Sequence, residues 1–243
     1  MIMAKNNITQ KVSCIIPAHN EAERIGSVLQ VVSSHLLISE VIVVQNFSTD
    51  NTSAVVRKFI QKKNKITKKI ILLEEYKHPG KSFAMYKGVL QSKYPVILFL
   101  DADLINLQKK HITNLLQPVL KNEADITIGF RDDPLLIFRA LGFDPFGGER
   151  ALKKKLFLEM PNCSDAQFGI ESLLNNYIVK QNKRVGIVTM DKVKHTMKYK
   201  KRGLVKGWQY EIQMHKQILR SISITRLLKD VYLLKKRIIV YGK

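Results

Sequence analysis

Short continuous apolar runs alternate with amphipathic segments along the first half of the chain. The apolar runs are rich in β-branched residues and predict buried strands, whereas the segments between them have apolar residues at helical spacing. Strands that are buried on both faces and joined by helices form a parallel sheet covered on each side. The strands are expected at 12–17, 40–44, 70–73 and 96–100, and the helices at 22–35, 52–63 and 81–92.

The second half of the chain is less regular and predicts one main domain with an addition at its end. Residues 131–148 are rich in Pro, Gly and Asp and predict a loop that is able to close as a lid. A basic loop over 192–206 and amphipathic residues from Trp208 onward follow. We therefore expect a domain over 1–206 and a basic, amphipathic helical extension over 207–243. Further helices are expected near 109–121 and 168–181, strands at 126–130 and 185–189, and either kind of element at 148–157.

Charge separates the end of the chain from its body. The 243 residues include 41 Lys and Arg against 20 Asp and Glu, a formal net charge of +21. Residues 180–243 hold 18 basic and three acidic side chains, whereas the preceding residues are close to balance. Such a charge favours an anionic partner, which is a phosphorylated substrate, an anionic membrane surface or nucleic acid. The single Trp and the lack of repeated aromatic positions in the basic region argue against a nucleic-acid stacking platform.

Cysteine content and apolar run length predict a cytoplasmic protein. Cys14 and Cys163 form neither a disulfide framework nor a zinc-binding pattern. No uninterrupted apolar run reaches the about 18 residues of a membrane span, and the N-terminus lacks the apolar stretch of a signal peptide. We expect the basic end of the chain to allow peripheral binding at the inner face of the membrane.

Polar clusters follow the predicted strands, at the edge where open α/β sheets bind ligands. Asp101 and Asp103 come directly after an apolar strand with the small Ala102 between them, so the two carboxylates can share a hard divalent cation. Lys81 opens a predicted helix, where both the ammonium group and the helix N-terminus favour a phosphate. Each feature alone also fits a simpler role, as a capped turn or an exposed lysine.

Other candidate residues carry a weaker signal. Glu171 lies in the first turn of a predicted helix, where an acid is usually a favourable contact with the helix dipole. Gly148 and Glu149 belong to a Gly-Gly turn, and His195, the one histidine considered as a metal ligand, lies among lysines. Neither a Walker A sequence nor a GxGxxG motif is present, so neither P-loop nor dinucleotide chemistry is indicated.

Four motifs in register resemble the nucleotide-binding half of family-2-like glycosyltransferases of the GT-A fold. They cover roughly residues 12–130 and read VSCIIPAHNEAERIGSVL, EVIVVQNFSTDNT, GKSFAMYKGV and VILFLDAD. The resemblance implies a Rossmann-like, mostly parallel sheet flanked by helices, and a divalent metal ion, Mn²⁺ or Mg²⁺, on the diphosphate of a nucleotide sugar. The nucleotide-binding positions that it implies are Pro17, Ala18, Asn20, Glu21, Gln45, Asn46, Lys81, Asp101 and Ala102.

The second half resembles glucosyl-3-phosphoglycerate synthases, a retaining branch of the same fold. The matching segments read GGERALKKKLFLEMP, FGIESLL and VKHTMKYKKRG. In that branch a Gly-x-Glu element shapes the sugar pocket, a later Glu contacts the sugar and a His completes the metal site. The resemblance thus implies sugar-binding roles for Gly148, Glu149 and Glu171, metal ligation by Asp103, His195 and Asp101, and catalytic roles for Glu171, Asp103 and Lys81.

The chain departs from both patterns at positions that decide specificity. Gln45 and Asn46 stand where family members usually have Asp. The Gln45 amide oxygen can accept the imide N–H of uracil, but the amide can also donate, so the base stays open with UDP-sugars favoured. The chain lacks the Arg/Thr segment that the synthases use on phosphoglycerate, so the acceptor stays open, with phosphorylated and lipid-linked acceptors considered.

The main interpretation is a metal-dependent glycosyltransferase that uses a nucleoside-diphosphate sugar, with retention favoured over inversion. In an inverting enzyme Glu171 would deprotonate the acceptor hydroxyl. The alternative is a nucleotidyltransferase that forms a nucleotide sugar from NTP and a sugar phosphate. That class usually needs a Gly-rich loop with a basic residue after the first strand, which PAHNEAERIG matches poorly. A nucleic-acid-binding module is the third interpretation.

Overall fold

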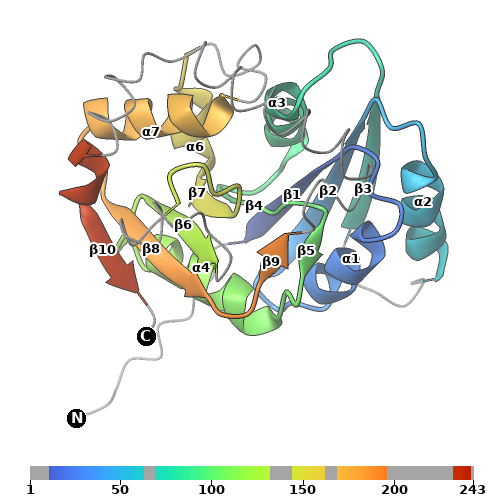
Figure 1. Cartoon of the computed structure of the whole chain (residues 1–243), viewed down its shortest axis with the longest axis horizontal. Helices are drawn as coiled ribbons and strands as arrows, with labels where there is room; N and C mark the ends of the chain where they lie inside the picture. Colours follow the sequence, from blue (N-terminus) through green and yellow to red (C-terminus); the bar gives the residue numbers. More distant parts are fainter. Residues whose placement is uncertain (1–10, 63–68, 132–143, 162–168, 196–231, 242–243) are drawn as a thin grey trace, which may run out of the picture.

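Helices and strands alternate in the computed structural model in the order that the sequence pattern predicts for the first half (Figure 1). The structure describes residues 11–62, 69–131, 144–161, 169–195 and 232–241. The first half contains β1 (Val12–Ala18), α1 (Ile25–Ser33), β2 (Ile38–Asn46), α2 (Thr52–Lys62), β3 (Lys69–Glu75), α3 (Lys81–Gln91) and β4 (Val96–Phe99). The second half contains β5 (Leu104–Ile105), α4 (Lys109–Leu120), β6 (Ile126–Arg131), β7 (Arg150–Lys153), α6 (Lys154–Leu158), α7 (Ile170–Lys180), β8 (Val185–Met190), β9 (Lys194–His195) and β10 (Ile238–Tyr241).

Eight of the strands form one mixed sheet in the order β10-β8-β6-β7-β4-β1-β2-β3. The strands are parallel except β7, which runs antiparallel to both β4 and β6. The strand order reverses at β1, because β2 and β3 lie on one side of it and β4 lies on the other. The expected mostly parallel sheet is confirmed, and its switch point lies between β1 and β4, where ligands bind in such sheets.

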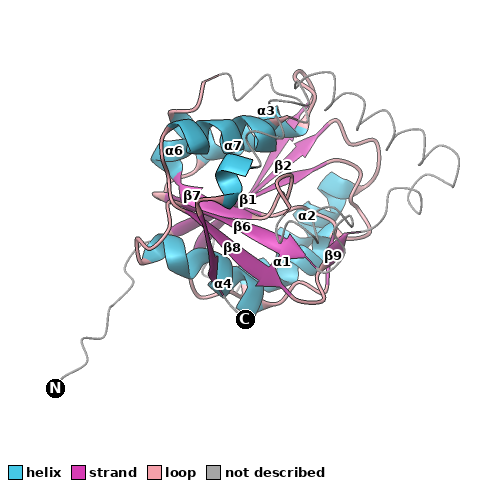
Figure 2. Ribbon diagram, turned by 60° about the vertical axis from the view of Figure 1, so that its left-hand side comes forward, coloured by secondary structure: helices cyan, strands magenta, loops and turns pink. Residues whose placement is uncertain are grey.

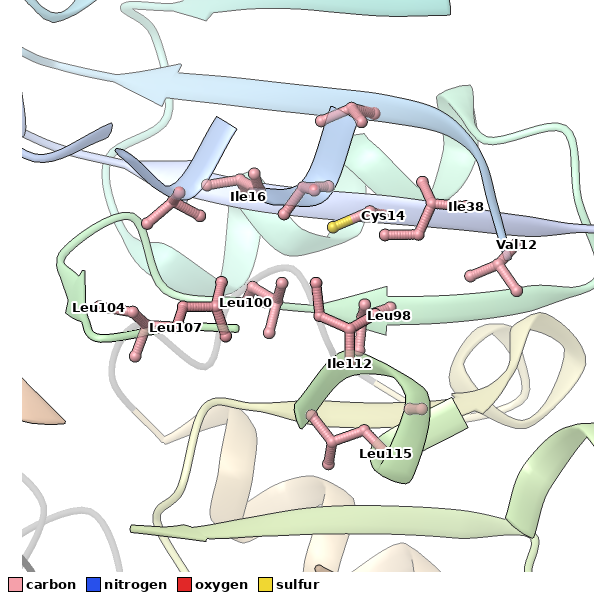
Figure 3. Packing of buried hydrophobic residues seen from close by; sticks show 14 of the residues in the cluster. Val12, Cys14, Ile16, Ile38, Leu98, Leu100, Leu104, Leu107, Ile112 and Leu115 are labelled. Atoms are coloured by element: carbon pink, nitrogen blue, oxygen red, sulfur yellow. The ribbon is translucent and has the colours of Figure 1, made fainter. Parts of the chain in front are cut away.

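Helices cover both faces of the sheet, as Figure 2 shows. On one face, apolar residues of α1 and α4 pack against alternate residues of β1 and β4; Figure 3 shows Cys14 and Ile16 near Leu98 and Ile112. On the other face, α3, α6 and α7 pack against the intervening residues. A Cβ on Gly88 of α3 would lie only 2.5 Å from the Ile15 side chain, so this glycine lets α3 approach β1 closely. That contact fixes the N-terminus of α3 beside the switch point.

The second half differs in detail from the sequence pattern. Residues 148–157 contain both a strand and a short helix, β7 and α6, and the start of the predicted basic loop forms the short strand β9. The chain returns at β10 to add an edge strand beside β8, an element that the pattern did not indicate. Most of the predicted lid, residues 132–143, and most of the basic end, residues 196–231, lie outside the described residues, and the domain boundary at 206 stays a prediction. No helix in the described part is both long and apolar enough to cross a membrane.

Candidate active site

The loops that follow β1 and β2 are tied together at the carboxyl edge of the sheet. Asn20 Oδ1 accepts the backbone N–H groups of Thr49 at 2.8 Å and Asp50 at 3.3 Å. The backbone N–H of Glu21 donates to Thr52 Oγ1 at 2.9 Å. Asn20 has a φ of 56°, a left-handed conformation that Asn tolerates better than most residues. The predicted nucleotide-binding residues Asn20 and Glu21 therefore lie at the expected edge, where their hydrogen bonds hold two loops in place.

Three further predicted nucleotide-binding residues at this edge have small apolar side chains. Pro17 and Ala18 end β1, and Ala18 is paired in register with Gln45 of β2. Ala18 and Ala102 are each 3% exposed and belong to the apolar core. Their small side chains let the strand ends pack closely, so any contact that they make with a ligand comes from the backbone.

Gln45 and Asn46, the last two residues of β2, are both buried but have different surroundings. Asn46 Oδ1 accepts the backbone N–H of Gly80 at 2.9 Å, and Asn46 Nδ2 donates to the carbonyl of His78 at 2.7 Å. Gln45 Nε2 donates to the Ser48 carbonyl at 3.5 Å, and no donor in the described part of the chain reaches Gln45 Oε1. Gln45 thus offers a buried acceptor, whereas Asn46 fastens the turn that leads into α3.

Lys81, the first residue of α3, lies between two carboxylates. Its Nζ is 2.9 Å from Asp101 Oδ1 and 2.9 Å from Glu171 Oε1. Burial of the lysine opposes its charge, but Asp101 and Glu171 outweigh this effect and raise the pKa of Lys81 above its ordinary value. Three predicted site residues from α3, the end of β4 and the first turn of α7 therefore meet around one stable positive charge.

Gly148 and Glu149 lie next to each other in the chain but contact different groups. A Cβ on Gly148 would lie 2.7 Å from both Asp101 Oδ2 and Lys81 Nζ, so no side chain fits beside this ion pair. Glu149 is fully buried, and its Oε2 lies 2.6 Å from Arg131 Nη1. Gly148 therefore forms one wall of the Lys81 cluster, and Glu149 anchors that wall to the end of β6 through Arg131.

A buried arginine that was not predicted as a site residue joins this wall to α7. Arg150 is fully buried and donates to the carbonyls of Gly147 at 2.7 Å and Pro145 at 2.8 Å. It also donates to Asn175 Oδ1 of α7 at 2.7 Å. The network therefore couples the turn that contains Gly148 to the helix that carries Glu171. Nothing in the sequence distinguishes this arginine, because the chain has many basic residues and burial follows from the pairing of β7.

A short two-stranded sheet brings the segments of the remaining metal-ligand candidates together. β5 begins directly after Asp103, and its antiparallel register pairs Leu104 with His195 of β9. The backbone of His195 thus lies opposite the residue that follows Asp103. The His195 side chain lies outside the described part, and among the side chains described no cluster of three or more His, Cys, Asp or Glu residues is arranged to hold a metal ion. Ligation by Asp101, Asp103 and His195 stays a prediction.

The chemistry of these groups fits a divalent cation. Asp101 and Glu171 bring two carboxylates to Lys81, which offsets one of their charges, and Asp103 follows two residues after Asp101. A bound diphosphate would add further negative charge to this edge. Carboxylate oxygens are ligands that Mg²⁺ and Mn²⁺ prefer, so Asp103 and Asp101 have the donor type that such an ion needs.

Known proteins match a large part of the chain in sequence. A model of the family described as glycosyl transferase family 2 matches residues 13–176. A glucosyl-3-phosphoglycerate synthase of Mycolicibacterium smegmatis is 31% identical over 142 residues, which cover 57% of this chain and 46% of the relative. A 4,4'-diaponeurosporenoate glycosyltransferase of Staphylococcus aureus is 33% identical over 107 residues, which cover 44% of this chain and 28% of the relative. The matched part of this chain thus spans less than half the length of these curated relatives.

The fold also has solved counterparts. A crystal structure of glucosyl-3-phosphoglycerate synthase from Mycobacterium tuberculosis, in complex with Mn²⁺, uridine-diphosphate-glucose and phosphoglyceric acid, superposes with a TM-score of 0.71. The superposition covers 92% of this chain and 80% of that chain at 21% sequence identity, and it confirms the expected GT-A fold. The family model covers more than half of the chain, including β1 to β4 and Glu171, and the chain therefore belongs to glycosyl transferase family 2.

Proposed function

We propose that the protein transfers a sugar from a nucleoside-diphosphate sugar to a phosphorylated or lipid-linked acceptor. The observation that carries this proposal is the position of the Lys81 ammonium between Asp101 and Glu171 at the switch point of the sheet. The cluster combines a positive charge for a diphosphate with carboxylates that can bind a metal ion and sugar hydroxyls. A UDP-sugar is the favoured donor, and a curated relative that carries the glucosyl-3-phosphoglycerate synthase name supports a glucosyl donor.

Lys81 contributes charge stabilisation at the diphosphate. When the bond between sugar and diphosphate breaks, negative charge develops on the leaving oxygen, and a fixed ammonium nearby lowers the energy of that state. The two carboxylates keep Lys81 protonated and hold its side chain in one place before the donor arrives. Gly148 leaves room beside this charge because it has no side chain.

A divalent ion held by Asp103, Asp101 and His195 would supply electrostatic stabilisation of the departing diphosphate. Glu171 lies at the sugar side of Lys81 in this proposal and accepts hydrogen bonds from donor hydroxyls. The resemblance of the GGER and His195 segments to a retaining branch favours retention at the anomeric carbon. The solved relative binds phosphoglyceric acid, so a small phosphorylated acid is the first acceptor to test.

A donor screen tests the proposal directly. The melting temperature of the protein would be measured with UDP-, GDP-, ADP- and dTDP-glucose, each with and without Mn²⁺. We expect the largest, metal-dependent increase with UDP-glucose, because at equal concentration the ligand that binds the folded state most tightly stabilises it most. Product analysis with phosphoglyceric acid should then show a glycoside of unchanged anomeric configuration. Release of pyrophosphate from UTP and glucose 1-phosphate would instead support a nucleotidyltransferase.

A carboxylate substitution tests the metal assignment. We expect Asp103→Asn to lower Mn²⁺-dependent turnover at least a hundred-fold, because the substitution removes an anionic metal ligand. Glu123→Gln is the matched control, since it removes one carboxylate from an exposed turn on the protein surface. Wild-type turnover by the Asp103→Asn variant at the same Mn²⁺ concentration would contradict the assignment.

A further inference from the structure

Three neighbouring strands each end directly before an aromatic side chain. His19 follows β1, Phe47 follows β2 and Tyr76 follows β3. The strands are parallel and adjacent, so these residues lie along one edge of the sheet. His19 Nδ1 donates to the Asn46 carbonyl at 2.8 Å, and the backbone N–H of Phe47 donates to the carbonyl of Glu75 at 3.0 Å. His19 is exposed, Phe47 is 36% exposed and Tyr76 is 57% exposed, so aromatic surface faces solvent at this edge.

Phe47 has a backbone conformation that the fold alone does not require of a phenylalanine. Its φ is 53°, in the left-handed region that bulky side chains rarely adopt. The other non-glycine residues with positive φ in the described part are four asparagines and a lysine: Asn20, Asn106, Asn122, Asn182 and Lys192. A glycine would take the same turn without strain. Strain that persists at a ligand-binding edge indicates a function for the side chain that causes it.

The surroundings of Phe47 offer two kinds of contact that a nucleobase uses. Its ring lies edge-to-face with Tyr76, with centroids 6.4 Å apart and planes at 62°, and Tyr76 Oη donates to Glu74 Oε1 at 3.3 Å. Two residues before Phe47, within β2, Gln45 is fully buried with an Oε1 that no described donor reaches. A flat aromatic surface can stack on a planar heterocycle, and an unpaired buried acceptor can bind an N–H group of such a ring.

The turn that holds Lys81 connects this edge to the proposed diphosphate site. Asn46 stands between Gln45 and Phe47, and its side chain binds both Gly80, directly before Lys81, and His78. A nucleotide with its diphosphate at Lys81 would therefore lie along the same edge of the sheet as the ends of β1 and β2.

We propose that Phe47, braced by Tyr76, is a specificity-determining residue that contacts the base of the nucleoside-diphosphate donor. The inference rests on the proposed function and deepens it, because it adds Phe47 to the nucleotide-binding residues that the family resemblance implies. A glycine at position 47 would avoid the backbone strain. We therefore expect the Phe47 ring to raise ligand affinity and to lower the stability of the fold.

The test compares ligand affinity and stability in the same variants. UDP would be titrated calorimetrically, with Mg²⁺ present, into the wild type and into Phe47→Gly. We expect about ten-fold weaker UDP binding, together with an unchanged or higher melting temperature without ligand. Mg²⁺-pyrophosphate, which lacks a base, should bind both proteins equally. Leu36→Ala is the matched control, because Leu36 is 95% exposed at the opposite end of β2 and its loss should not alter UDP binding.

Each outcome of this experiment separates the inference from the proposed function. Equal UDP affinity of the wild type and Phe47→Gly would overturn the contact with the base and leave the proposed function intact. An equal loss of UDP and pyrophosphate affinity would also overturn it, since the ring would then act through the shape of the loop. A wild type that binds none of UDP, GDP, ADP and dTDP would overturn the proposed function itself. Phe47→Leu should bind UDP more weakly than the wild type because leucine has no flat ring, and wild-type affinity of this variant would overturn a contact that needs the ring.

Discussion

Asn46 stands where family members usually have Asp, and this difference changes the hydrogen bonds that the end of β2 can form. Asn46 uses both polar atoms of its side chain inside the protein, accepting from the backbone of Gly80 and donating to the carbonyl of His78. An aspartate could keep the first contact but not the second, because a carboxylate has no donor and would face a carbonyl oxygen. The turn before Lys81 is therefore matched to asparagine at this position.

We expect Asn46→Asp to lower the free energy of unfolding by about 1–3 kcal/mol, the cost of leaving a buried polar group without its partner. Urea unfolding followed by circular dichroism measures this change. Because Gly80 directly precedes Lys81, donor affinity should fall as well. Asn51→Asp is the control, since Asn51 is exposed and its substitution adds the same charge. A variant as stable as the wild type would show that the two hydrogen bonds contribute nothing to the fold.

Residue identities at the strand ends could be predicted because polar clusters after apolar runs are visible in the sequence. Lys81, Asp101 and Glu171 were predicted separately and meet within hydrogen-bond distance. Arg150 and Phe47 could not be found in this way. The burial of Arg150 depends on strand pairing that is distant in sequence, and the left-handed backbone of Phe47 depends on a turn whose usual residue is glycine.

Elements with long apolar runs were located well, and those with polar residues or distant partners were not. The second strand extends over Ile38–Asn46, beyond the predicted 40–44, because polar residues at its end are accommodated inside the protein. Asn46, for example, is buried, and both polar atoms of its side chain form hydrogen bonds. β7 and β10 pair with strands far away in the chain, and local periodicity contains no information about such pairing.

The link between β7 and α7 can be tested by removing its arginine. Arg150→Met leaves the carbonyl of Gly147 and the amide oxygen of Asn175 without their donor, and the carbonyl of Pro145 keeps only its hydrogen bond from Asn175 Nδ2. We expect the free energy of unfolding to fall by about 2–5 kcal/mol, since several buried acceptors lose a charged partner together. Chemical denaturation of the purified variant measures the loss.

Arg184→Met provides the comparison for Arg150→Met. Arg184 pairs with Asp125 at 3.2 Å, but its side chain is 49% exposed, and pairs of this kind contribute about 1 kcal/mol or less. The two variants lose the same side chain from different surroundings. A similar loss of stability in both would contradict a structural role for the Arg150 network. If Arg150→Met remains folded, a lower turnover number at unchanged Michaelis constant would support its role in positioning Glu171.

At the scale of the whole molecule, the charge distribution could be located from the sequence, but its purpose could not. Part of the basic end is described, and it combines two kinds of side chain. Tyr232, Ile239 and Val240 are 58%, 45% and 60% exposed, and Lys235 and Lys236 are exposed between them. Apolar and aromatic residues next to lysines are the composition that binds an anionic lipid surface. Binding to such a surface stays a prediction, and these exposed residues are the ones that we expect to contact the lipid.

We expect the protein to sediment with vesicles that contain phosphatidylserine at low salt, and much less with phosphatidylcholine alone. Each lysine near an anionic surface contributes about 1 kcal/mol, so Lys235→Glu/Lys236→Glu should reduce the bound fraction strongly. The matched control is Lys58→Glu/Lys62→Glu, which reverses two exposed charges on α2. An equal effect of both pairs would show that only net charge matters and would remove the case for a lipid-binding end. Because screening weakens electrostatic attraction, binding that survives 0.5 M salt would instead assign the main role to the apolar side chains of this end.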